Sequence, residues 1–97
     1  MHLVIEIPAE LPGSDLVRDG IADLAAGRES EAGLLVAMAA PRLRALGLQV
    51  PQSSEPVPSH RLYDLLSDAG PGAHSRYNAL VARIISFARA AEHAVGR

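Results

Sequence analysis

The sequence predicts an all-α domain of four helices, or of five if the second helix breaks at Pro41. Apolar residues recur every three or four positions along most of the chain, as they do on the buried face of a helix. Ser, Gly and Pro stand where such segments begin and end. Ala, the best helix former, supplies 17 of the 97 residues. We therefore expect one orthogonal or bundle-like domain over residues 1–97.

The first 13 residues are expected to form an extended arm. Residues 3–7 are largely apolar and β-branched, and Pro8 closes the segment, which is the composition of a short strand. A lone strand needs a partner, and no other segment is an equally good candidate. The arm would then either pack against the domain or pair across a dimer.

A first helix is expected over residues 15–26. Ser14 is the predicted N-cap, Asp15 suits the positive end of the helix, and Gly27 is the predicted C-terminal stop. Gly20 lies inside this helix, where it costs up to about 1 kcal/mol relative to Ala.

The second helix is expected to follow an N-cap at Ser30. Pro41 cannot donate a hydrogen bond to the preceding turn. The helix therefore either kinks at Pro41, or ends near Ala39 and is followed by a short helix that stops at Gly47.

Residues 48–58 contain three prolines, which predicts an extended connector between two helical halves. A ligand for a proline-binding module is the weaker interpretation of this segment. Ser59 is the predicted N-cap of a third helix over residues 60–69.

The last helix is expected over residues 73–94 and is the longest. At 1.5 Å per residue it would be about 33 Å long, so its far end would reach past a small domain. Its apolar stripe comprises Tyr77, Leu80, Ile84, Phe87, Ala91 and Ala94.

Charge is unevenly distributed along the chain. Residues 1–58 carry a net charge of −4 and residues 59–97 a net charge of +2. Either the two halves attract each other, or the second half faces an acidic partner. The acidic first helices and the total of −2 argue against DNA binding, although the basic second half keeps nucleic acid as a minor alternative.

The start of the long helix is the densest group of polar side chains. Free backbone N–H groups make a helix N-terminus suited to an anion, and His74, Ser75 and Arg76 would add hydrogen bonds to a phosphate or carboxylate. Tyr77 and Asn78 complete this turn. An ordinary capping turn is the simpler alternative.

No pattern of catalytic, metal-binding or nucleotide-binding residues stands out. There is no Cys, and the four His do not form a recognised ligand motif, so we expect neither a metal nor another cofactor. No apolar run reaches the roughly 20 residues of a membrane span, and no signal peptide is evident, so a cytoplasmic protein is expected.

These observations favour a non-enzymatic interaction protein. A thin, Ala-rich core and a long helix with a broad apolar face suggest an accessory subunit, an adaptor, an antitoxin-like partner or a homo-oligomer. The expected contact residues on the long helix are Arg76, Tyr77, Arg83, Phe87 and Arg89.

Several blocks resemble small helical proteins of high-GC actinobacteria, a group without an established activity. The blocks are GLLVA (33–37), APRLRALG (40–47), HRLY (60–63), AHSRYNAL (73–80) and SFARA (86–90). The resemblance covers about residues 14–93 and implies a cytoplasmic bacterial protein with a helical fold. It carries over no catalytic residue.

Overall fold

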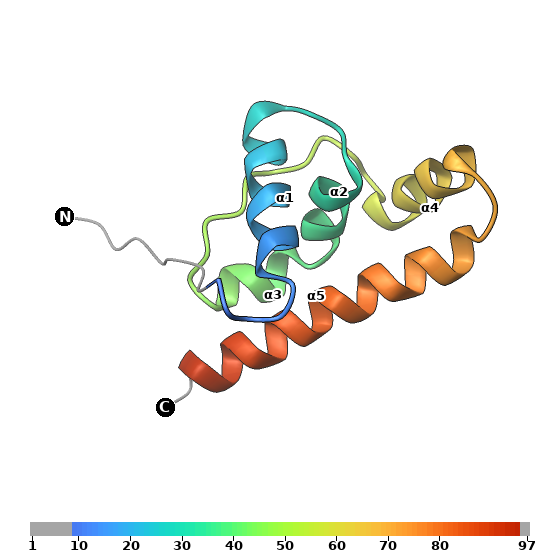
Figure 1. Ribbon diagram of the computed structural model, residues 1–97. Coiled ribbons are helices and arrows are strands. Elements are labelled where there is room, and N and C mark those ends of the chain that lie inside the picture. Colours follow the sequence, from blue (N-terminus) through green and yellow to red (C-terminus); the bar gives the residue numbers. More distant parts are fainter. Residues whose placement is uncertain (1–8, 96–97) are drawn as a thin grey trace.

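A computed structural model of the chain describes residues 9–95 and shows five helices and no strand in that part (Figure 1). The helices are α1 (Ser14–Ala26), α2 (Glu31–Met38), α3 (Ala40–Ala45), α4 (Pro58–Ala69) and α5 (Ala73–Val95). The predicted all-α fold is confirmed. The predicted strand-like segment, residues 3–7, lies outside the described residues.

Helix α2 is the centre of the fold and contacts all four other helices. Figure 1 shows it between α1 and α4, with the long α5 passing below the group. Gly33, Leu34, Leu35 and Val36 in the middle of α2 are all buried. A helix that is apolar around its whole circumference belongs inside a domain, which explains this position.

Gly20 allows α1 and α2 to pack closely. A Cβ atom added at Gly20 would overlap the carbonyl oxygen of Ala32 and the Cγ2 atom of Val36. The glycine that lowers the helix propensity of α1 is therefore required by the packing of the two helices.

Glycine and proline set the predicted boundaries of α1 and α2. Gly27 follows α1 with a φ of 72°, a left-handed conformation that glycine adopts without strain. The hydroxyl of Ser30 caps α2 by accepting a hydrogen bond from the Gly33 N–H at 2.9 Å. Pro41 lies in the first turn of α3, so α2 ends before it and does not kink through it.

Two predicted caps are wrong. Ser14 is the first residue of α1, after Gly13 in the N-cap position, and its hydroxyl donates to the carbonyl of Ala9 at 3.0 Å. Helix α4 begins at Pro58, one residue before the expected cap Ser59. Proline fixes φ near the helical value and lacks the N–H that a first turn cannot use, so Pro58 starts the helix early.

The proline-rich connector forms part of the core. Its residues Leu48 and Val50 are each 8% exposed and join the main apolar cluster. The guanidinium of Arg44 holds the segment by donating from Nη2 to the carbonyl of Val50 at 2.8 Å. The connector therefore adds buried surface to a domain whose helices are rich in alanine.

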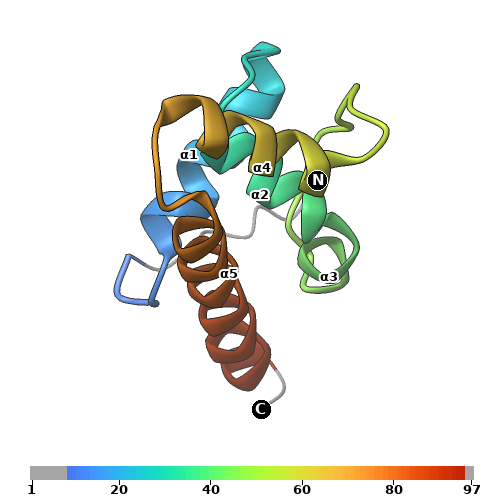
Figure 2. The same ribbon diagram turned by 90° about the vertical axis from the view of Figure 1, so that its right-hand side faces the viewer.

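Helix α5 lies along the longest dimension of the described residues, which measure 43 × 24 × 19 Å. One face is buried through Ile84, Phe87, Ala88 and Ala91, and Figure 2 shows the helix from near its N-terminal end, with its outer side uncovered. Close to the C-terminal end, Glu92 accepts two hydrogen bonds from Arg42 of α3, at 2.6 and 2.9 Å. This end is thus fastened to the domain.

Candidate functional site

Three rings form an aromatic cluster where α4 faces the start of α5. The ring centroids of Tyr63 and Tyr77 lie 5.6 Å apart, and those of Tyr63 and His74 lie 6.5 Å apart. The rings are tilted by 55° and 57°, within the range of favourable edge contacts between aromatic side chains. Tyr63 is 38% exposed, so the cluster reaches the surface.

The cluster lines a shallow, open hollow of about 380 Å³, together with Ser59, His60 and Asn78. Inside it the Nδ2 atom of Asn78 lies 3.2 Å from the Nε2 atom of His74. The amide donates this hydrogen bond when the imidazole carries its hydrogen on Nδ1. The lining of the hollow thus combines aromatic and polar side chains.

Exposed residues continue from the hollow along one side of α5. Asn78, Ala82 and Ile85 follow each other at helical spacing and so share this side. Ile85 is 37% exposed, one of the few large apolar side chains exposed among the described residues. We call the set Tyr63, His74, Tyr77, Asn78, Ala82 and Ile85 the α4–α5 surface.

The predicted arginines do not belong to this surface. Arg76 forms an ion pair with Glu31 at 3.7 Å, and Arg83 forms one with Asp15 at 3.2 Å. The predicted anion site around Arg76 therefore already has a carboxylate beside it. Of the predicted residues, the structure brings together His74, Tyr77 and Asn78, while Ser75 and Arg89 lie exposed on α5 outside the hollow.

Phe87 is buried and supports the fold. It is 1% exposed and belongs to the main apolar cluster. A Cβ atom placed on Gly13 would lie 3.5 Å from the Cβ atom of Phe87, so the turn before α1 covers this part of α5. A partner cannot reach Phe87 in this fold, and the expected contact at this residue is corrected.

The opposite charges of the two halves pair with each other at the surface of the domain. Three ion pairs connect an acid of the first half with an arginine of the second: Glu29 with Arg61, Glu31 with Arg76, and Asp15 with Arg83. Of the two interpretations of the charge pattern, attraction between the halves is the one that the structure contains. Each pair is substantially exposed, so each adds little stability by itself.

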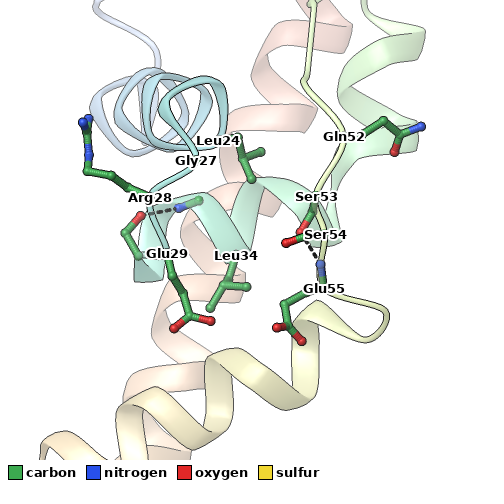
Figure 3. A pocket seen from close by; sticks show the side chains of 11 residues that line it. Leu24, Gly27, Arg28, Glu29, Leu34, Gln52, Ser53, Ser54 and Glu55 are labelled. Atoms are coloured by element: carbon green, nitrogen blue, oxygen red, sulfur yellow. Dashed lines mark hydrogen bonds between the residues drawn. The ribbon is translucent and has the colours of Figure 1, made fainter.

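A second concavity, of about 230 Å³, lies between the α1–α2 turn and the proline-rich connector (Figure 3). We call it the turn–connector cleft. Figure 3 shows Leu24 and Leu34 at its back, with Glu29 on one side and Ser53, Ser54 and Glu55 on the other. Gly27, Arg28, Ser30, Gly33 and Gln52 complete the lining.

No pattern in the sequence predicts this cleft. Its walls come from two separate segments, residues 24–34 and residues 52–55, and the close approach of these segments is a property of the tertiary fold. The only local sequence feature that relates to the cleft is the run of polar residues 52–55 within a proline-rich segment.

Neither concavity has the residues of a metal centre. Among the residues that the structure describes, no three His, Cys, Asp or Glu side chains are grouped so that they could hold a metal ion. In the same part of the chain, no helix has both the length and the apolar composition needed to cross a membrane.

No protein-family model matches the chain, and no curated protein or solved structure matches it significantly. The resemblance to actinobacterial proteins therefore stays a prediction.

Proposed function

We propose that this protein is a non-catalytic interaction module that binds another protein through its α4–α5 surface. One observation carries the proposal: Tyr63, one of only three Phe or Tyr residues in a chain without Trp, is 38% exposed and packs against Tyr77 at the edge of a hollow. Tyrosines in such positions are frequent anchors of protein–protein interfaces.

The shape of the surface fits a protein better than a small molecule. Small-molecule sites enclose most of the ligand, whereas this hollow is shallow and open. Ala79, Ala82 and Ser86 on the outer side of α5 are small and exposed, which lets a second helix approach closely. We therefore favour an amphipathic helix of the partner, lying along α5 with one apolar side chain in the hollow.

This surface would make the chain an accessory subunit, an adaptor or an antitoxin-like partner, acting in the cytoplasm as expected from the sequence. A second copy of the chain would be an alternative occupant. Anion binding at residues 72–78 is less favoured, because Glu31 already lies beside Arg76. Nucleic-acid binding is less favoured because Arg61, Arg76 and Arg83 are engaged with carboxylates.

A matched pair of substitutions tests the surface. Ala82→Glu places a charge on the α4–α5 surface, and Ala22→Glu places the same charge on an exposed position inside α1. Each full-length variant would be used for affinity purification from the source cells, followed by titration calorimetry with the purified partner. Light scattering would measure self-association.

We expect Ala82→Glu and Tyr63→Ala to weaken binding by at least about tenfold, the usual effect at an interface anchor, while Ala22→Glu binds as the parent does. A partner that binds all the variants equally would show that it uses another surface. A well-folded chain that neither self-associates nor retains a partner would contradict the proposal.

A further inference from the structure

We propose that the turn–connector cleft is a binding site for a small organic monocation, meaning an ammonium or guanidinium group on a short apolar chain. The cleft is independent of the α4–α5 surface. It lies between the end of α1, the start of α2 and residues 52–55 (Figure 3).

The charged groups around the cleft are three carboxylates, of Asp23, Glu29 and Glu55, and two guanidinium groups, of Arg28 and Arg61, which leaves one negative charge in excess. Glu29 is paired with Arg61 through two hydrogen bonds of 2.7 and 2.8 Å. Arg28 is turned outward in Figure 3 and pairs with Asp23 at 2.9 Å. Glu55 is partly buried, and its carboxylate has no hydrogen bond or ion pair within residues 9–95; it feels the charge of Arg61, whose hydrogen bonds go to Glu29. One positive charge would complete the site.

An anion is a less suitable ligand for this cleft, because the carboxylate of Asp23 already lies at the start of α2. The start of α2 borders the cleft, and a helix N-terminus attracts negative charge. Here the Ser30 hydroxyl accepts from the Gly33 N–H and donates to Asp23 Oδ2 at 2.6 Å. The carboxylate of Asp23 thus compensates this end of the helix, and the excess charge at the cleft is negative.

The uncharged part of the cleft suits a short alkyl chain. Leu24 and Leu34 provide an apolar back wall, and the hydroxyls of Ser53 and Ser54 lie at the side (Figure 3). The volume of about 230 Å³ equals that of several water molecules at about 30 Å³ each, which is room for such a chain and its charged head group.

The test is a titration of the ¹⁵N-labelled full chain with n-butylguanidinium chloride, followed by NMR at constant ionic strength. We expect saturable shifts of the backbone amides of residues 27–34 and 53–55. n-Butanol supplies the same alkyl chain without charge, and butyrate supplies it with the opposite charge, so both should shift these amides less at equal concentration.

Two glutamate substitutions separate the site from general charge effects. Glu55→Gln removes the free carboxylate but keeps the shape of the side chain, and Glu10→Gln removes an exposed carboxylate outside the cleft. We expect Glu55→Gln to weaken binding about twofold to fivefold, as for a partly exposed charge contact, and Glu10→Gln to change it little.

Unchanged affinity in Glu55→Gln, equal binding of n-butanol, or the absence of saturable shifts would each overturn the proposal. Shifts confined to residues 60, 63 and 74 would do the same, since they would place the probe in the α4–α5 hollow. None of these results depends on whether Tyr63 binds a protein partner.

Discussion

Arg61 of α4 holds Glu29, which follows α1, in a two-pronged ion pair. Its Nε atom lies 2.7 Å from Glu29 Oε2, and its Nη2 atom lies 2.8 Å from Oε1. This parallel geometry is the strongest that a guanidinium and a carboxylate can form. The side chains are 35% and 41% exposed, so water and salt screen the attraction. The pair fastens the second half of the chain to the first.

The pair makes stability depend on pH in a defined direction. The guanidinium of Arg61, mainly through its hydrogen bonds, holds the pKa of Glu29 below its ordinary value of 4.5. Because the folded pKa lies below the unfolded one, the pair stabilises the fold above about pH 4.5. This contribution is lost as the pH falls through the folded pKa.

We therefore expect Glu29→Gln to lower the Tm at pH 7, and the difference from the parent to shrink steadily as the pH is lowered to 3. Circular dichroism melting curves over this range would measure it. Glu10→Gln is the control, since Glu10 has no ion pair among the described residues. A difference in Tm between Glu29→Gln and the parent that does not change with pH would contradict this explanation.

Gly20→Ala tests the close packing of α1 on α2. In an exposed helix this substitution would stabilise by about 0.5–1 kcal/mol. Here the new Cβ would meet the Ala32 carbonyl and Val36 Cγ2, so we expect a net loss of about 1–3 kcal/mol in urea unfolding. Ala22→Gly, at an exposed position of the same helix, should cost no more than about 1 kcal/mol. A stabilising Gly20→Ala would show that the helices pack less closely.

Local signals predicted the helices well where one residue type fixes the backbone. Gly27 ends α1 because glycine adopts a positive φ, and Pro41 breaks the second helical segment because it lacks an N–H. Serine is less decisive, since it occupies both the N-cap and the first turn. Ser30 is a cap, whereas Ser14 turns its hydroxyl back to the preceding loop.

The candidate surfaces were only partly predictable, because they combine residues from different helices. Helical spacing places His74 and Asn78 side by side, but it does not reveal that Tyr63 of α4 packs against the same turn. Arg76 and Arg83 are seven positions apart and so share one side of α5, but this spacing does not reveal that acids of α1 and α2 face them. Such contacts depend on the tertiary fold and leave no local pattern.

Ser30→Ala should destabilise the chain by about 1 kcal/mol, the usual cost of losing an N-cap. The hydroxyl joins the Gly33 N–H to the carboxylate of Asp23, and its hydrogen bond is the main cause that lowers the pKa of Asp23. Ser75→Ala, at an exposed position of α5, should have a much smaller effect. Urea unfolding of both variants would measure this. Equal losses would show that the Ser30 hydroxyl does not act as a cap.

Substitutions at Phe87 and Tyr63 separate packing from binding. Phe87 is 1% exposed, so Phe87→Ala should lose about 3–5 kcal/mol of stability, a large part of the total for a small domain. Tyr63→Ala removes a ring that is 38% exposed and should lose about 1.5 kcal/mol or less, mostly from the contact with Tyr77. Guanidinium unfolding gives both values. If Tyr63→Ala instead destabilises the chain as much as Phe87→Ala, the aromatic cluster is part of the core. The exposure of Tyr63 would then no longer support its role as a binding anchor.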